Sequence, residues 1–454
     1  MLDPMNRLTA DDDLFVKLHH MYPNLLATQV AWVFDEPLPR EFWQKFTDHL
    51  AHGFVARRVR KTRIPFARPW FDQLQIPIIV NEDTEPVPAD GYLDWLWQKG
   101  DFEVDPYNGV IANVCIAPTT DGGQIVTYVV SHIIADGGAG LRALKDAIAR
   151  FDADLPVSYE ESSGKQVGTT PDSKLVEVRG HLVDAGRQLR AAGIGLGRAW
   201  KARHVTGKPR NPRPAEPRLH FDGEWTPASV ILEVPVADVE RIAEQRGGTV
   251  NGVMVALCTG LLGRSGRVTE GTKVRVEVPH ALRSGDGDAS ANNTTALPIQ
   301  VTYRSGGKID LVEIRDAIRT AGQAYKDPSR TPPIQHLQPI QMMLPLPVLR
   351  YLSRTAKNPE ALVSNMGEVI QSVSTIGGVK ARIVVGRPRL GLAPVDLYRS
   401  LEAGVNLFTG NDGKTMMLNI NGCDPDRFPT RESLQKMIVD EFNDWGLTPN
   451  FWGC

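Results

Sequence analysis

One short segment of the chain places a histidine between a strand and a helix. The β-branched and aromatic side chains of residues 124–131 predict a buried strand, and His132 follows it directly. The pair Asp136 and Gly137, typical of a tight turn, precedes a predicted helix over 140–150. A rigid strand end holds an imidazole in one place, as a general base requires. A structural histidine that only ends a buried strand is the plainer alternative, and this segment alone favours it.

The length of the chain predicts two domains. Its 454 residues exceed the size at which a single hydrophobic core stops growing. Hydrophobic residues make up 42% and charged residues 23%, which is ordinary for a soluble globular protein. The net charge of −2 gives no reason to expect a nucleic-acid partner, because proteins that bind nucleic acid usually carry a strongly basic surface.

The composition changes between two similar halves. Residues 1–155 mix predicted strands and helices, and 217–454 do so again in a similar order. Between them, 156–216 contains a polar stretch, a helix predicted over 176–205 and a proline-rich run. We therefore expect a mixed α/β fold with an N-terminal domain, a partly helical, basic linker and a C-terminal domain. The apolar, proline-broken segment 339–352 is expected to pack against the core, with an acyl groove or a membrane surface as its alternatives.

Two clusters of basic residues interrupt an otherwise balanced charge pattern. One spans 57–63, and the other spans 187–213 with eight lysines and arginines. Runs of this kind usually form solvated surfaces, and we expect that here. The alternative is a surface that binds phosphates, whether of CoA, of the phosphopantetheine arm of a carrier protein or of lipid headgroups.

The sequence predicts no metal site, no bound cofactor and no membrane span. The four cysteines form no Cys-x-x-Cys pair, and the adjacent His19 and His20 have no acidic or cysteine neighbour at ligand spacing. The N-terminus lacks the basic and apolar regions of a signal peptide, and no apolar run approaches the ~20 residues that cross a bilayer. We expect a cytoplasmic protein, with peripheral membrane contact left open.

The segment around His132 resembles a known signature. Residues 131–137, Ser-His-Ile-Ile-Ala-Asp-Gly, are similar to the H-H-x-x-x-D-G motif of the CoA-dependent acyltransferase superfamily. This superfamily includes nonribosomal peptide condensation domains, polyketide-associated acyltransferases and bacterial wax ester synthase/diacylglycerol acyltransferases. Further segments resemble motifs of the wax ester synthase family, in the family's order: 8–15, 249–257, 278–283, 292–293 and 363–367. The sequence departs from the motif at Ser131, where the first histidine would stand.

The resemblance implies a role for each motif residue. His132 matches the catalytic histidine and is expected to act as the general base. Asp136 matches the aspartate that completes the catalytic motif by pairing with an arginine, and Arg283 stands at the matching arginine position. Gly137 is expected to adopt a turn conformation that a side chain would obstruct. The remaining candidates for contacts with the substrate or the oxyanion are Ser131, His280, Asn293, Ser364 and Asn365.

The same resemblance implies two chloramphenicol-acetyltransferase-like domains with a tunnel between them. It implies transfer of an acyl group from an acyl-CoA thioester to an alcohol, in lipid or secondary metabolism, with the thioester as substrate. A donor carried on the phosphopantetheine arm of an acyl carrier protein, giving an ester or an amide, is one alternative. A catalytically degenerate binding protein is another. The chain has no Gly-x-Ser-x-Gly elbow for a serine nucleophile, which agrees with direct transfer.

Overall fold

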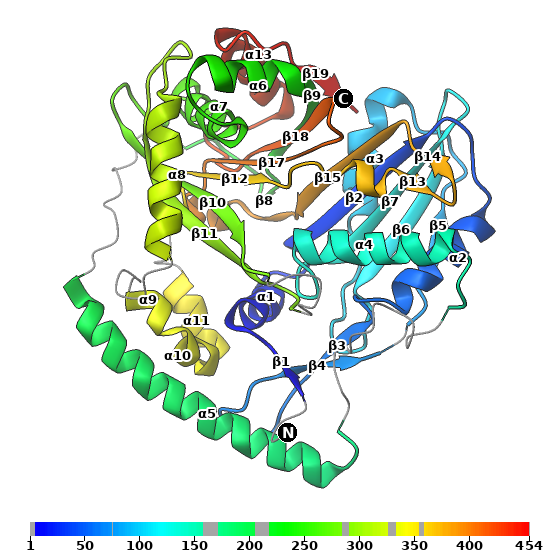
Figure 1. The fold of residues 1–454 in the computed structure, drawn as a ribbon, viewed down its shortest axis with the longest axis vertical. Helices are drawn as coiled ribbons and strands as arrows, with labels where there is room; N and C mark the ends of the chain where they lie inside the picture. The colour runs from blue at the N-terminus through cyan, green and yellow to red at the C-terminus, as the bar shows by residue number, and fades with distance from the viewer. Residues whose placement is uncertain are drawn as a thin grey trace.

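Two mixed sheets lie at the centre of the molecule, and helices cover the outer side of each (Figure 1). The computed structural model describes residues 5–74, 76–157, 171–204, 218–283, 290–325, 333–353 and 358–453. The predicted mixed α/β class is confirmed, because both sheets combine parallel and antiparallel strand pairs. Parts of the predicted linker, 158–170 and 205–217 with its proline-rich run, lie outside the described residues.

The first sheet carries His132 at the end of its central strand. Its strands, in spatial order, are β15 (Ile383–Leu390), β2 (Leu26–Phe34), β7 (Gln124–Ser131), β6 (Ala112–Pro118) and β5 (Val80–Glu82). Helices α2 (Arg40–Ala51) and α4 (Gly137–Asp152) cover one face, where Val126 and Tyr128 enter their core. Ile125 points the other way, into a cluster with α3 (Tyr92–Lys99). Burial on both faces explains why β7 is a continuous hydrophobic run.

The second sheet forms the other half. Its strands, in spatial order, are β11 (Thr294–Thr302), β10 (Lys273–Ala281), β12 (Ala361–Asn365), β17 (Val405–Asn411), β18 (Thr415–Gly422), β9 (Ala228–Pro235) and β19 (Asn450–Trp452). Its helices are α6 (Val236–Gln245), α7 (Val250–Arg264), α8 (Leu311–Tyr325) and α13 (Arg431–Asp444). Helix α7 is apolar all round because the sheet and its neighbouring helices enclose it.

A strand from the C-terminal half of the chain completes the sheet of the N-terminal half. Strand β15 comes from the C-terminal half of the chain, yet it pairs antiparallel with β2 along its full length, from Ile383 opposite Val33 to Leu390 opposite Leu26. The cluster around α3 also combines residues of both halves, including Ile231 of β9. These contacts fix the two lobes against each other.

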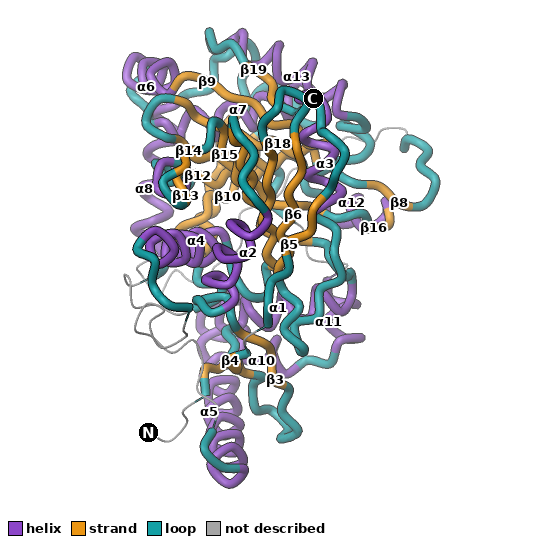
Figure 2. The backbone as a smooth tube through the Cα atoms, turned by 90° about the vertical axis from the view of Figure 1, so that its right-hand side faces the viewer, coloured by secondary structure: helices purple, strands orange, loops and turns teal. Residues whose placement is uncertain are grey.

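Smaller elements surround the sheets (Figure 2). They include a three-stranded sheet of β1 (Asn6–Arg7), β4 (Trp70–Gln73) and β3 (Arg57–Arg60), and helix α1 (Ala10–Met21). The helix predicted over 176–205 is present as α5 (Lys174–Lys201). The remaining strands and α-helices are β8 (Glu224–Trp225), β13 (Thr375–Ile376), β14 (Val379–Lys380), β16 (Ala393–Pro394), α9 (Pro333–His336), α10 (Gln338–Met343), α11 (Leu346–Ser353) and α12 (Val395–Leu401).

Two expectations from the sequence are wrong. The basic run 57–63 does not form a solvated surface throughout, because Arg57 is fully buried and its guanidinium lies over the rings of Phe54 and Phe71. The apolar segment 339–352 does not pack mainly against the core. It forms α10 and α11 outside the two sheets, and Tyr351 remains exposed.

Candidate active site

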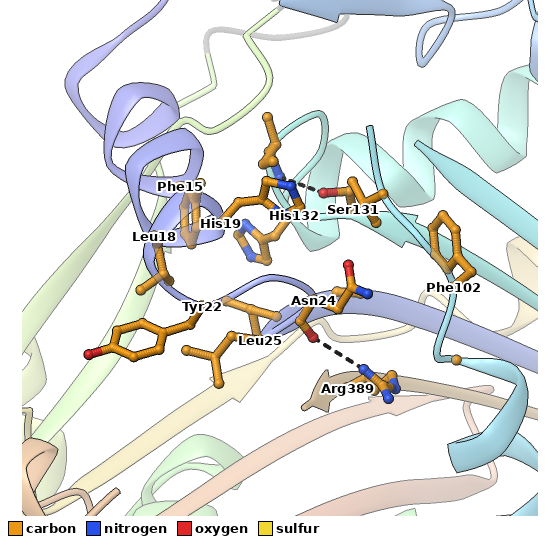
Figure 3. Close-up of a pocket in the computed structure, with 15 residues that line it drawn as sticks. Phe15, Leu18, His19, Tyr22, Asn24, Leu25, Phe102, Ser131, His132 and Arg389 are labelled. Atoms are coloured by element: carbon orange, nitrogen blue, oxygen red, sulfur yellow. Dashed lines mark hydrogen bonds between the residues drawn. The ribbon is translucent and has the colours of Figure 1, made fainter. Parts of the chain in front are cut away.

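His132 lines a cavity between the first sheet and helix α1 (Figure 3). The cavity contains about 400 Å³ of empty space, part of it open to solvent. The imidazole stands directly after β7, and Phe15 of α1 packs against it with the ring centroids 4.1 Å apart. The opposite wall includes Arg389 of β15. The described residues therefore form a cavity at this histidine, whereas a continuous tunnel between the lobes stays a prediction.

The environment of His132 favours the neutral imidazole. Burial lowers its pKa below the usual 6.5, although the charge of Asp136 opposes that shift. Its Nδ1 is buried and has no hydrogen-bond partner among the described residues. A neutral imidazole can accept a proton, so this residue can act as a base at neutral pH.

The loop that carries His132 is held by two side chains from distant segments. Asn292 donates its Nδ2 to the His132 carbonyl at 3.1 Å and to Asp12 Oδ1 at 2.9 Å. Arg57 donates to the carbonyl of Ile134, two residues further along the loop. These hydrogen bonds fix the backbone on both sides of the turn, as a preorganised site requires.

Asp136 is committed to structural contacts. Its carboxylate caps α4 by accepting from the Ala139 N–H at 2.8 Å, and Arg283 Nη2 lies 2.7 Å away. The Asn293 N–H and the Thr294 hydroxyl also donate to it, at 3.1 and 3.0 Å. Burial alone would raise the pKa of Asp136, but the Arg283 guanidinium and these donors hold it below its usual value. The ion pair implied by the resemblance is thus present, and it joins α4 to the segment linking β10 and β11.

The glycine that lies against this ion pair is Gly138. We expected Gly137 to adopt a special turn conformation, and this expectation is wrong: Gly137 begins α4 with a negative φ, and a Cβ there would find only the Met366 side chain, at 3.7 Å. A Cβ on Gly138 would lie 2.8 Å from Arg283 Nη1. The constraint therefore comes from the close approach of the arginine rather than from the turn.

The remaining candidates lie at different distances from the cavity. Ser131 is buried and lines it, and its hydroxyl accepts weakly from the Ile133 N–H at 3.4 Å. Asn293 contributes its backbone to Asp136. His280 is exposed near the end of β10 and is not part of the cavity wall.

Ser364 and Asn365 stand at the end of β12, also outside the cavity wall. Asn365 Oδ1 accepts from the Gly367 N–H at 2.9 Å, so this amide oxygen shapes a turn. Neither side chain therefore reaches the space beside His132 in this conformation.

Several residues of the site were missed from the sequence. Phe15 and Leu18 of α1, with Tyr22 at its C-terminal cap, line the cavity, and helical spacing within this segment was the available signal. His19, considered from the sequence only as a metal ligand, also lines it, and burial lowers its pKa. The part of the chain that the structure describes contains no group of three His, Cys, Asp or Glu side chains arranged to hold a metal.

Comparison with known proteins bears on the fold. No protein-family profile and no curated protein matches the chain. The first condensation domain of the calcium-dependent antibiotic synthetase superposes with a TM-score of 0.62 at 14% identity, over 97% of this chain and 96% of that one. The starter condensation domain of rhizomide synthetase RzmA gives 0.60 at 12%, over 97% and 93%.

A wax ester synthase/diacylglycerol acyltransferase from Marinobacter aquaeolei VT8 gives a TM-score of 0.55 at 15% identity, over 97% of this chain and all of that one (100%). At these low sequence identities, the comparisons show a shared fold and nothing about function. The predicted architecture is confirmed at that level: the chain has the two-lobed fold of condensation domains and of the wax ester synthase/diacylglycerol acyltransferase.

Proposed function

We propose that this protein is an acyltransferase that moves an acyl group from acyl-CoA to an alcohol, with His132 as the general base. The observation that carries the proposal is the imidazole itself. It is fixed by its strand and loop, burial holds its pKa below the usual value, and it lines a cavity that is partly open to solvent. Because Nδ1 is the buried ring nitrogen, we assign Nε2 to the acceptor.

The chemistry requires no covalent enzyme intermediate. His132 Nε2 takes the proton of the acceptor hydroxyl while the oxygen attacks the thioester carbonyl carbon. The tetrahedral intermediate then collapses, the carbon–sulfur bond breaks, and the imidazolium returns the proton to the thiolate. The products are an ester and free CoA. Asp136 takes no part in the proton transfer, since its oxygens are occupied by Arg283 and the α4 cap.

The donor is proposed to be CoA-bound. A similarly folded protein, the RzmA starter condensation domain, was solved in complex with C8-CoA. The alternative is a donor on the phosphopantetheine arm of an acyl carrier protein, which the resemblance of residues 131–137 to the condensation-domain motif implies.

Release of free thiol distinguishes these proposals. The protein is incubated with acyl-CoA or with an acylated carrier protein, each with a panel of alcohols and amines. Thiol release from acyl-CoA that depends on an alcohol is the expected result. Release from the acylated carrier protein alone would identify that protein, in place of acyl-CoA, as the donor. No release from either donor would favour a non-catalytic binding protein.

Helix α5 supports peripheral membrane contact, which we propose as part of the protein's localisation. It lies at the edge of the molecule in both views (Figures 1 and 2) and exposes apolar side chains at steps of seven residues, Leu175, Leu182, Leu189 and Leu196. This spacing forms one stripe on the helix surface. The same helix also exposes five basic side chains: Arg179, Arg187, Arg190, Arg198 and Lys201. This combination suits a helix lying on an anionic membrane surface.

No described helix is both long and apolar enough to span a bilayer. Sedimentation with phosphatidylglycerol vesicles is expected to carry the protein down, and phosphatidylcholine vesicles are expected not to. Replacing Leu189 and Leu196 by serine should reduce binding at least tenfold, since each buried leucine contributes ~1.5 kcal/mol or more. Leu392→Ser, at an exposed site on another surface, is the matched control.

Unchanged vesicle binding by the double variant would contradict this role of α5. If the helix instead binds a carrier protein, the wild-type protein should sediment with neither kind of vesicle. Arg187→Glu combined with Arg190→Glu should then abolish binding of an acidic acyl carrier protein.

A further inference from the structure

Two arginines lie buried on the same face of β15. Arg387 and Arg389 are 4% and 1% exposed, and their spacing of two residues directs both side chains to one side of the sheet. Nε and Nη1 of Arg387 have no hydrogen-bond partner among the described residues. Arg389 Nη2 lies 3.4 Å from Asp101, a carboxylate that is itself 58% exposed.

Arg389 is partly compensated by Asp101 and by the carbonyls of Asn24 and Trp97, whereas two nitrogens of the buried Arg387 guanidinium lack a partner among the described residues. A guanidinium removed from water is costly unless an anion or several hydrogen bonds replace the lost hydration. Burial, followed by the like charges of Arg389 and Arg431, lowers the pKa of Arg387 to about 9. Arg387 therefore keeps its proton at neutral pH, and a bound anion would relieve the cost.

The strand register places Arg389 two strands away from Ser131, the residue that precedes His132. Arg389 pairs with Ala27 on β2, and Ala27 pairs with Ser131 on β7, so the three residues form one row across the sheet. Two strand spacings separate the ends of this row by roughly 10 Å. Ala27, which lies between them, has a small side chain and lines the same cavity. Figure 3 shows Arg389 and His132 on opposite sides of that space.

The surrounding backbone is shaped to hold Arg389 there. A Cβ on Gly100 would lie 2.5 Å from Arg389 Cδ, so a side chain at this position would displace the arginine. Asn24 adopts a left-handed conformation, with φ of 57°, and its carbonyl accepts from Arg389 Nη1 at 3.2 Å. Asn24 also lines the cavity, with a buried Oδ1 that has no partner among the described residues.

We propose that Arg389 binds a carboxylate or phosphate carried by a small acceptor, whose hydroxyl or amine then lies at His132. The inference rests on the proposed function and names its acceptor class. The planar guanidinium suits both anions, and the charge of Arg387 nearby strengthens the attraction. The phosphates of CoA do not fit this position during transfer, because the pantetheine arm separates them from the reacting sulfur by far more than two strand spacings.

The test uses pairs of acceptors that differ in charge. Lactate is compared with lactamide, and glycerol phosphate with glycerol, using acyl-CoA as donor. At least one anion is expected to show a KM at least tenfold below that of its neutral partner, and Arg389→Gln should remove this difference by raising the KM of the anion. Arg382→Gln, an exposed arginine just before β15, is the matched control.

A second variant separates binding from a structural role. Asp101→Asn removes the carboxylate beside Arg389 and should tighten anion binding several-fold, whereas a purely structural arginine predicts no gain. Calorimetry without any acyl donor, on the His132→Ala variant, measures this binding independently of catalysis. Charge-selective binding without acyl transfer would refute the proposed function but keep this inference.

Equal binding of the charged and neutral partner in both pairs would overturn the inference. So would an Arg389→Gln variant whose only change is a raised KM for acyl-CoA, because that result would assign the arginine to the donor. Selectivity confined to lactate or to glycerol phosphate would identify the anion as a carboxylate or a phosphate.

Discussion

Replacing His132 by alanine is expected to lower kcat by a factor of about 10² to 10⁴, the usual contribution of a positioned general base. The substitution removes the imidazole that takes the acceptor proton, whereas Asn292 and Arg57 continue to hold the loop through backbone carbonyls. We therefore expect a folded protein with little change in the KM for the donor. Initial rates of thiol release, with circular dichroism as the check on folding, measure this effect. Undiminished thiol release by the variant would show that His132 is not the general base.

The pH dependence of the wild-type protein follows from the same residue. Only the neutral imidazole accepts a proton, and burial lowers the pKa of His132 below 6.5. The value of kcat/KM should therefore remain high at pH 6.5 and fall only at more acidic pH, as the ring becomes protonated. His220→Ala, which changes an exposed histidine, should keep the wild-type profile. A profile whose acidic limb lies well above pH 6.5 would contradict a buried, neutral base.

Replacing Asp136 by alanine is expected to lower the free energy of unfolding by about 3–5 kcal/mol, because it leaves the buried charge of Arg283 without its partner. The variant also loses the α4 cap and the acceptor for Asn293 and Thr294. Urea unfolding followed by tryptophan fluorescence measures the change. Asp396→Ala, at an exposed partner of Arg399, is the matched control and should leave the midpoint unchanged.

A second substitution tests whether charge explains the loss. Combining Asp136→Leu with Arg283→Met removes both charges and should recover part of the stability that Asp136→Leu alone loses. The pKa of Asp136 lies below 3.8, so its stabilising effect should be complete above that pH and disappear as pH falls through the lowered value. Equal losses in the single and double variants would show that the ion pair contributes little.

The sequence predicted the elements whose signals are local. The run 124–131 is buried on both faces of a sheet, and the helices predicted over 140–150 and 176–205 are present as α4 and α5. Their patterns were readable because burial repeats with the period of the element. The strand Ala361–Asn365 was missed, since its few residues have little periodicity and gain their place only by pairing between β10 and β17.

The site was only partly predictable for the same reason. Motif spacing placed His132 and Asp136 on one loop, and the resemblance supplied Arg283 as the partner. The spacing gave no indication that Arg57 would be buried under that loop, since an arginine in a basic run normally stays in water. Cation–π contacts and the Ile134 carbonyl, which only the folded chain brings together, stabilise it there.

By itself, the sequence determined that a strand would carry His132 into a turn and a helix, because side-chain periodicity and turn chemistry act between near neighbours. Only the tertiary structure decided what surrounds the imidazole. Strand β15 crosses from the far half of the chain to pair with β2, and this pairing brings Arg389 to the cavity. Contacts across more than two hundred residues depend on how the two lobes pack, and no local pattern specifies that packing.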